Sequence, residues 1–300
     1  MSLSRIRTFI EVYRQRSISG AARSLNLTQP AVSQHISGLE AVIGRPLFVR
    51  SPSGVKPTSA ADELAMDVGD KLDATERALA SARARSMDIE GVLQVAGYSG
   101  FLEEVLSEQL LPLLESGVKI RMHSGNNDLV VSLVLEGHCD LGVSPLPVLD
   151  NRLKSEKIFT SRVLPVASPR VAERLAKAEH FDQAIRKEPL LAYNLELSLV
   201  DQWLIKNRIS VEGLVPAMVS QDLRSQRKLL VRGFGWSVMP EFLCQEYIGK
   251  GELVELPSPV GTREINYYLI WLPSALRQVR VAHAHQTLLN QLGTSVERFS

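Results

Sequence analysis

The sequence predicts an α/β protein with a separate helical module at its N-terminus. Its 300 residues exceed one small module and fit about two domains. Over the first 43 positions, apolar residues recur at three- and four-residue steps, which is typical of amphipathic helices. From position 91 onward, short apolar runs alternate with helical segments, which is typical of a parallel α/β sheet.

Composition and charge narrow the class of protein. Hydrophobic residues make up 45% and charged residues 22% of the chain, as in soluble globular proteins. The sequence has no run of about 18 apolar residues, which is the length needed to span a membrane. Its charged N-terminus is unlike a signal peptide. We therefore expect a cytoplasmic protein without a membrane partner.

The charge is unevenly distributed. Residues 1–58 hold eight basic and two acidic residues, a net of +6, whereas the remainder holds 26 basic and 31 acidic residues, a net of −5. A basic head on an acidic body indicates a module that binds a polyanion. The two cysteines, Cys139 and Cys244, form no disulfide framework, and we expect buried thiols. A redox role would require the two to meet in space, which the sequence leaves open.

Three short helices are expected in the basic head. Leu3 to Tyr13 supply the apolar face of the first, and Ser17 and Ser19 can cap the second, which ends near Asn26. Thr28 can cap the third, with Pro30 in its first turn, where a missing N–H costs little.

The third helix carries the main functional prediction. Val32, Ile36, Leu39 and Ile43 form one buried stripe, and the opposite face is small and polar, with no carboxylate before Glu40. Gln can pair with adenine edges, and Ser and Pro are tolerated beside bases, so the pattern indicates a helix-turn-helix. Residues 45–50 and 55–58 flank a Pro/Ser/Gly turn and suggest a wing. Expected DNA contacts are Ser19, Thr28, Gln29, Pro30, Ser33, Gln34, Ser37, Arg50 and Lys56. The alternative is an ordinary three-helix domain that binds protein or nothing.

Residues 19–50, SGAARSLNLTQPAVSQHISGLEAVIGRPLFVR, resemble the N-terminal signature of the LysR-type transcriptional regulators. The shared elements are A-A-x-x-L, T-Q-P-A-V-S-x-x-I-x-x-L-E and G-x-x-L-F-x-R. The chain departs from the family's Thr-x-x-Gly after the wing, because Thr58 is followed by Ser59, Ala60 and Ala61. The resemblance implies a winged helix-turn-helix at 1–58, a linker helix at 59–88 and an effector-binding domain at 89–300.

The expected linker helix has a narrow apolar seam. Its members advance by threes and fours: Ala61, Leu64, Val68, Leu72, Thr75, Leu79 and Ala82. Such a seam suits pairing with a second copy, which the resemblance also implies; the alternative is packing on its own domain. A dimer would place two recognition helices on two half-sites of double-stranded DNA. Dimer and tetramer stay open, and RNA polymerase is a candidate partner.

The rest of the chain predicts a two-lobed domain. Strands are expected at 91–97, 118–122 and 139–143, with helices between them, and later strands at 162–167, 190–193 and 267–271. The resemblance implies a fold like that of periplasmic binding proteins. Lobe I would comprise 89–161 and 267–300 and lobe II 162–266, with crossings near Ser161–Arg162 and Asn266–Tyr267.

An effector would lie where strands end and helices begin, because helix N-termini offer free N–H groups to small organic anions. The candidate residues are Tyr98, Ser99, Gly100, Phe101, Asn126, Asn127, Ser144, Tyr193, Asn194, Gly233 and Phe234.

Catalytic and metal motifs are incomplete. Ser99 lies in a near match to a nucleophile elbow that lacks the final glycine, and residues 233–238 lack the third glycine of a dinucleotide fingerprint. His123 and the pair His138-Cys139 have no second pair at metal spacing. We therefore predict no enzyme, cofactor or metal. The alternatives are an enzyme with a DNA-binding head and an architectural DNA binder.

Overall fold

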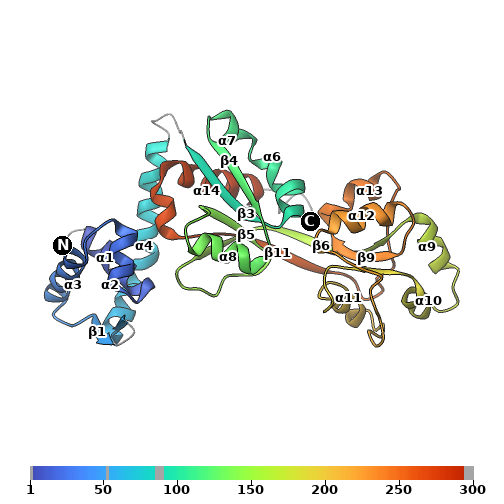
Figure 1. Ribbon diagram of the computed structural model, residues 1–300, viewed down its shortest axis with the longest axis horizontal. Coiled ribbons are helices and arrows are strands. Elements are labelled where there is room, and N and C mark those ends of the chain that lie inside the picture. Colours follow the sequence, from blue (N-terminus) through green and yellow to red (C-terminus); the bar gives the residue numbers. More distant parts are fainter. Residues whose placement is uncertain (1–2, 52–53, 85–90, 294–300) are drawn as a thin grey trace.

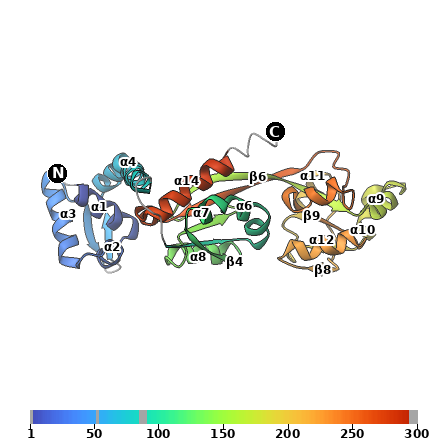
Figure 2. The ribbon, with the colours of Figure 1, turned by 90° about the horizontal axis from the view of Figure 1, so that it is seen from above.

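A computed structural model describes residues 3–51, 54–84 and 91–293. The chain forms three bodies in a row: a helical N-terminal module, a central α/β lobe and a second α/β lobe at the far end (Figure 1). The view from above shows the same order, with α14 lying between α4 and the central lobe (Figure 2).

The N-terminal module is a helical core with a small hairpin. Phe9, Val12, Ala21, Val32 and Leu39 are almost fully buried in it, so the predicted apolar stripe of the third helix faces inward. The elements are α1 (Leu3–Gln15), α2 (Ile18–Leu25), α3 (Gln29–Ile43), β1 (Phe48–Ser51) and β2 (Gly54–Pro57).

Helix α4 (Ser59–Ala84) leads from this module to the rest of the chain. Ala61 and Leu72 are buried in the core of the N-terminal module, and Leu64 and Val68 pack against it. The first half of the predicted pairing seam is therefore used within the chain, because α1 lies against it. Helix α14 packs along α4 as well. Positions 85–88 of the predicted linker lie outside the described residues.

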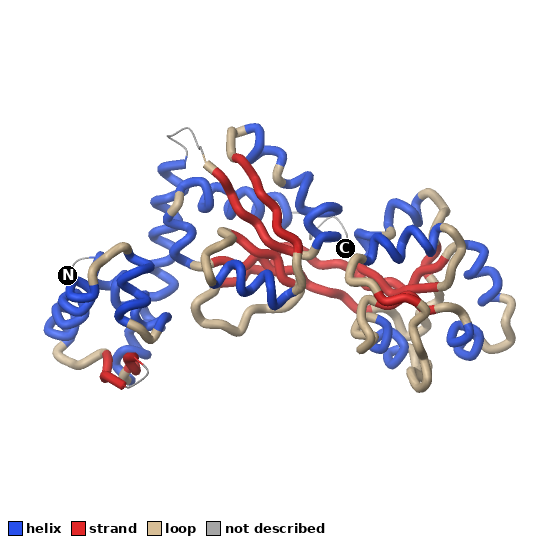
Figure 3. The backbone as a smooth tube through the Cα atoms, viewed as in Figure 1, coloured by secondary structure: helices blue, strands red, loops and turns tan. Residues whose placement is uncertain are grey.

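Both lobes share one nine-stranded sheet, in the order β4-β3-β5-β11-β6-β9-β7-β8, with β10 paired to β6. Figure 3 shows the strands running through both lobes as a continuous band. The bounds are β3 (Val92–Gly97), β4 (Lys119–Ser124), β5 (Leu141–Ser144), β6 (Lys154–Ala167), β7 (Leu190–Ala192), β8 (Met218–Val219), β9 (Trp236–Pro240), β10 (Val254–Glu255) and β11 (Arg263–Trp271).

Helices cover the sheet in each lobe. Lobe I carries α5 (Ser99–Phe101), a π-helical turn η1 (Leu102–Leu106), α6 (Ser107–Gln109), α7 (Leu111–Glu115), α8 (Asn127–Leu135), the 3-10 turn η3 (Pro273–Arg277) and α14 (Val279–Gly293). Lobe II carries α9 (Pro169–Ala176), α10 (Phe181–Lys187), α11 (Val200–Lys206), α12 (Leu223–Val231), the 3-10 turn η2 (Glu241–Leu243) and α13 (Gln245–Gly249).

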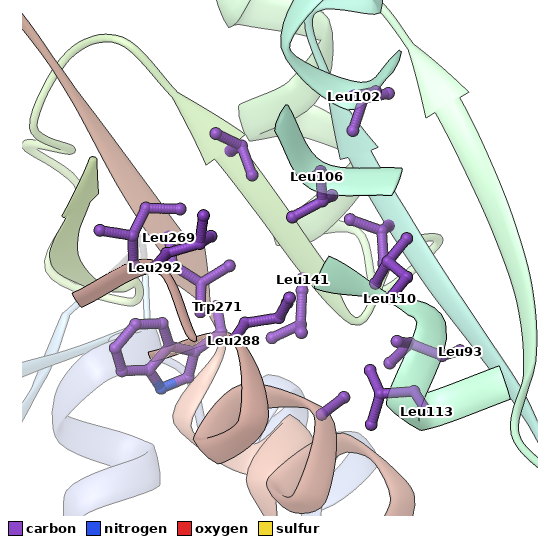
Figure 4. Packing of buried hydrophobic residues seen from close by; sticks show 14 of the residues in the cluster. Leu93, Leu102, Leu106, Leu110, Leu113, Leu141, Leu269, Trp271, Leu288 and Leu292 are labelled. Carbon is purple, nitrogen blue, oxygen red and sulfur yellow. The ribbon is translucent and has the colours of Figure 1, made fainter. Parts of the chain in front are cut away.

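The core of lobe I joins early and late parts of the chain. Leu93 and Leu141 from the first strands meet Leu269 of β11 and Leu288 of α14 (Figure 4). Each of the four is fully buried. Lobe I therefore closes only when the last segments of the chain are in place.

Two long strands connect the lobes. In β6, Ile158 belongs to the core of lobe I and Val163 to that of lobe II, and β11 runs antiparallel beside it with Ser161 opposite Ile265. The predicted crossings lie on these two strands. Sequence reasoning missed the first half of β6, because Lys154 to Lys157 are largely exposed and carry no apolar pattern.

Candidate DNA interface and effector cavity

Local hydrogen bonds position the third helix. The Oγ of Ser17 accepts the backbone N–H of Gly20 at 3.0 Å, and Oγ1 of Thr28 accepts that of Ala31 at 3.4 Å. Asn26 ends α2 in the left-handed region with φ 54°, which lets the chain turn sharply into α3. The sequence thus sets both caps of the helix-turn-helix.

The outer face of α3 is free for contact. Thr28, Gln29, Pro30, Ser33, Gln34 and Ser37 are all exposed, opposite the buried Val32, Ile36 and Leu39. Glu40 turns back instead: its Oε1 accepts the backbone N–H groups of Leu47 at 2.7 Å and Phe48 at 3.3 Å. This carboxylate therefore fixes the start of β1 rather than facing a DNA ligand.

The hairpin separates its two cations. Arg50 lies opposite Val55, and Lys56 lies opposite Val49. Because directly paired residues share one face of a two-stranded ribbon, Arg50 and Lys56 lie on different faces. Both are exposed.

A surface groove between α2 and α3 extends the exposed face of the recognition helix. Ser19, half-buried, lines this groove together with Gln29 and Arg23. Arg23 is exposed there, and the sequence analysis did not single it out.

A cavity of about 290 Å³ lies between the two lobes. Five of the predicted effector residues line it: Tyr98, Ser99, Gly100, Phe101 and Tyr193. Beyond Pro145, which follows the candidate Ser144 at the end of the third predicted strand, sequence reasoning missed the other lining residues, which are Leu146, Ser198, Leu199, Gln202, Gln221, Leu223, Pro240, Phe242, Leu243, Arg263, Ile265 and Tyr267. Most of these come from lobe II and from β11, where the sequence carries no strand-to-helix signature.

Three tyrosines lie in the cavity wall. The phenol groups of Tyr98 in lobe I and Tyr193 in lobe II lie close enough to influence each other's pKa values. Burial raises the pKa of Tyr98 to about 12, and it also raises the pKa values of Tyr193 and Tyr267. All three phenols are therefore protonated and neutral near pH 7.

Three predicted effector residues lie behind this wall. Asn126 caps α8 by accepting the backbone N–H of Leu129 at 3.0 Å, and the backbone of Asn127 lies close enough to the Tyr98 phenol to lower its pKa. Ser144 is fully buried and donates to Oδ1 of Asn127 at 2.6 Å. Asn127 thus lies next to Tyr98, and none of the three residues is part of the cavity lining.

The remaining predicted residues lie elsewhere in lobe II. Asn194 uses its side chain to accept the backbone N–H of Ser198 at 3.0 Å, as a local cap. Gly233 and Phe234 precede β9, whereas its last residue, Pro240, lines the cavity. The turn at 233–234 is thus at the end of β9 away from the cavity, because the strand runs toward the cleft.

Arg263 is the only charged residue among those that line the cavity. Its Nε is buried without a hydrogen-bond partner, and no ion pair joins Arg263 to any other residue in the described part of the chain. Arg263 lies four residues before the strand predicted at 267–271, in a part of the predicted lobe II for which no helix or strand was expected.

Ion pairs close the cleft beside the cavity. On the π-helical turn, Glu104 pairs with Arg227 of α12 at 2.8 Å, and Glu103 pairs with Arg224. A π-helical turn inside a longer helix is a common feature of functional sites. The pairs join lobe I to lobe II.

A second cluster of charges joins the N-terminal module to the rest of the chain. Arg277 of η3 pairs with Glu76 of α4 at 2.9 Å and lies 3.6 Å from Glu11 of α1. Arg7 also pairs with Glu76. Glu76 and Glu11 are both buried, so this cluster connects α1, α4 and η3 at one point.

Cys139 and Cys244 are buried in the cores of different lobes and are not bonded to each other. Burial raises the thiol pKa to about 11 for Cys139 and about 12 for Cys244. Among the described residues, no three His, Cys, Asp or Glu side chains gather as a metal site would require. In the same part of the chain, every helix is too short or too polar to cross a membrane.

Comparison with known protein families gives two matches that together cover most of the chain. Residues 3–62 match the family described as "Bacterial regulatory helix-turn-helix protein, lysR family". Residues 78–293 match the family described as "LysR substrate binding domain".

Curated relatives match over nearly their whole length. The HTH-type transcriptional regulator AbaB of Streptomyces antibioticus is 29% identical over 298 residues, covering 96% of this chain and 97% of the relative. The HTH-type transcriptional regulator TrpI of Pseudomonas aeruginosa is 27% identical, with 97% of each chain covered.

Solved structures share the fold. CrgA of Neisseria meningitidis, a LysR-type transcriptional regulator, aligns with a TM-score of 0.59 at 17% identity, over 98% of this chain and 99% of that one. The full-length virulence activator AphB of Vibrio cholerae aligns with a TM-score of 0.55 at 17% identity, over 97% and 99%.

Proposed function

The chain belongs to the LysR family of bacterial transcriptional regulators, and we propose which of its residues read DNA and which receive the effector. It is a DNA-binding regulator with a helix-turn-helix domain and a domain for a small-molecule effector. The family consists of regulators rather than enzymes. We propose that this chain likewise has no catalytic activity and acts in the cytoplasm.

DNA sequence is read by the exposed face of α3. Gln29, Ser33 and Gln34 contact base edges in the major groove, with Pro30 and Ser37 beside them. Ser19, Thr28, Arg50 and Lys56 contact the backbone, and Arg23 adds a further cation at the groove that Ser19 and Gln29 line. The observation that carries this proposal is the exposed polar face opposite a fully buried stripe. Because Arg50 and Lys56 lie on different faces of the wing, they contact different phosphates.

The effector occupies the cavity between the lobes. Tyr98, Ser99 and Phe101 approach it from lobe I and Tyr193 from lobe II, so a ligand there contacts both lobes at once. Asn127 lies behind Tyr98, and its side chain is fixed by a hydrogen bond from Ser144. A ligand that prefers one arrangement of the lobes shifts the population toward it.

The active unit is an oligomer that presents two recognition helices. Helix α4 supports this proposal, because Leu79 of the predicted seam is 50% exposed, and Met66, on another face of the same helix, is 82% exposed. Apolar side chains exposed along one helix favour pairing with another copy. The seam that pairs is therefore the part of α4 not already covered by α1 and α14.

Binding to the DNA upstream of its own gene tests the assignment of α3. A chain carrying Gln34→Ala and Ser33→Ala should lose about 10- to 100-fold in affinity for its specific site, since a base contact contributes about 1–3 kcal/mol. Binding to unrelated DNA should be unchanged, because the phosphate contacts remain.

Val42→Ala is the matched control for this experiment. Val42 is 59% exposed on the same helix and lies about 180° around it from Ser33, so it should bind both DNAs like the wild-type chain. If the wild-type and doubly substituted chains bind the specific DNA site with equal affinity, the assignment of these two residues is contradicted. Equal affinity of the wild-type chain for specific and unrelated DNA would favour the architectural alternative.

A further inference from the structure

Arg263 gives the cavity a chemical preference. It begins β11, and its guanidinium has a buried Nε without a partner in a wall that is otherwise uncharged. From this geometry we infer that the effector is a small carboxylate with a compact apolar body such as a six-membered ring, its carboxylate paired with Arg263. The inference rests on the proposed role of the cavity as the effector site.

Nearby acidic residues do not compensate Arg263. Glu264, the next residue, is exposed and points to the other side of the strand, since side chains alternate along β11. Glu241 and Glu255 both pair with Arg162, at 3.3 Å and 2.9 Å. A guanidinium Nε that is buried without a partner is unfavourable, so an anion that pairs with Arg263 in the cavity relieves this cost.

The shape of the donor favours a carboxylate over a phosphate. A guanidinium presents two parallel N–H groups that match the two oxygens of a carboxylate. A phosphate dianion would be left with a second charge and further acceptor oxygens, and the lining offers no second cation.

The rest of the wall defines the body of the ligand. Phe101, Phe242 and Tyr267 form an aromatic cluster beside the cavity, with ring centroids 4.5 Å apart for Phe101 and Tyr267 and 5.8 Å apart for Phe242 and Tyr267. An engineered apolar cavity of about 150 Å³ holds benzene. A cavity of about 290 Å³ therefore has room for a six-membered ring with a carboxylate and a small substituent.

Neutral polar groups complete the lining. The amides of Gln202 and Gln221 and the protonated phenols of Tyr98 and Tyr193 can exchange hydrogen bonds with a hydroxyl or keto substituent on the ring. None of them repels a carboxylate, because all are uncharged near pH 7.

Titration calorimetry of the full-length protein tests the inference with four named probes. Benzoate and cyclohexanecarboxylate should bind in the millimolar range or tighter. Benzamide, which has the ring without the charge, and inorganic phosphate, which has the charge without the ring, should bind at least about 10-fold more weakly than benzoate. The inference is overturned if neither carboxylate binds at millimolar concentration, or if benzamide or phosphate binds as well as benzoate.

Two substitutions and a control identify the residue. Arg263→Gln should weaken benzoate binding about 30-fold or more, the factor that corresponds to the loss of one partner of a buried charge pair, and Arg263→Lys should restore part of it. Arg170→Gln is the control, because Arg170 is exposed on α9 of the same lobe. Unchanged benzoate affinity in Arg263→Gln would assign the charge preference to some other group.

Thermal unfolding of the same variants separates a binding role from a structural one. Without ligand, Arg263→Gln should melt at or above the wild-type temperature, because it removes an uncompensated charge. A lower melting temperature would show that Arg263 supports the fold and would overturn its assignment to the ligand. Specific DNA binding of the wild-type chain is measured in parallel, so that failure of the regulator proposal and failure of the carboxylate proposal are distinguishable.

Discussion

Removing Glu104 from the cleft should open the two lobes. Glu104 of lobe I pairs with Arg227 of lobe II at 2.8 Å, and their side chains are 22% and 11% exposed. In Glu104→Gln, Arg227 keeps two contacts within its own lobe. Its guanidinium still donates to the carbonyl of Leu243 at 2.7 Å and still stacks on the ring of Tyr247, 4.6 Å from the ring centroid. The substitution therefore removes the charge attraction of one of the two ion pairs between the lobes without displacing Arg227.

The size of the effect follows from the geometry of the pair. At 2.8 Å and an effective dielectric constant of about 20, the attraction is about 6 kcal/mol before desolvation. Desolvation and ordering of the side chains offset most of it, leaving the ~2 kcal/mol of a charged hydrogen bond. That corresponds to about a 30-fold shift of the lobes toward the open arrangement. The affinity for a ligand of the closed cleft should fall in proportion to the closed fraction.

Energy transfer between two dyes measures this opening. The dyes are attached through Lys119→Cys in lobe I and Arg170→Cys in lobe II, both exposed positions. The native thiols should not react, because both are buried and their pKa values are raised. Glu108→Gln is the control, since Glu108 is exposed on α6 near the pair. The reasoning is refuted if Glu104→Gln leaves the transfer efficiency unchanged, or if Glu108→Gln lowers it equally.

Two further results are expected. Glu40→Ala should lower the stability of the N-terminal module by about 1.5–3 kcal/mol, because it leaves the N–H groups of Leu47 and Phe48 without their charged acceptor. Thermal melts compare it with the control Glu63→Ala, whose side chain is 71% exposed and lies 3.9 Å from Arg45. Equal melting temperatures of the two variants would contradict the prediction. Alkaline pH should destabilise the fold, because burial raises the pKa of Cys244 from 9.0 to about 12. The folded state then holds a proton that the unfolded state releases, so the contribution is complete below pH 9.0 and is lost as pH rises toward about 12. Urea unfolding across this range should show a smaller loss for Cys244→Ala than for the wild-type chain, and an equal loss would rule Cys244 out as its source.

The DNA-binding region could be predicted from sequence because its signals are local. Caps, a turn residue and the spacing of apolar positions lie within a few residues of one another, and Ser17, Thr28 and Asn26 act as their types suggest. The role of Glu40 in holding the start of β1 could not be predicted, because the N–H groups that it accepts belong to Leu47 and Phe48, beyond the end of its own helix.

The cavity could be predicted only in part, for the opposite reason. Tyr98 to Phe101 follow a strand and begin a helix, which is a local signature. Arg263 and Gln221 reach the cavity through the pairing of strands far apart in sequence, and no periodicity reports that. The turn at Gly233 carried a strong local signal but lies at the other end of its strand, since a turn does not reveal which end of a sheet it serves.

The place of β11 in the sheet also sets an order of assembly during synthesis. This strand, from Arg263 to Trp271, lies between β5 and β6, so lobe I lacks an interior strand until most of the chain has been made. Helix α14 follows later still and covers α4. Because domains made first can fold first on the ribosome, the DNA-binding head is complete long before the domain that governs it. A chain that stops before Arg263 would therefore carry a complete DNA-binding module on an incomplete effector-binding domain, and its control by an effector depends on β11 and α14, which are translated after that module.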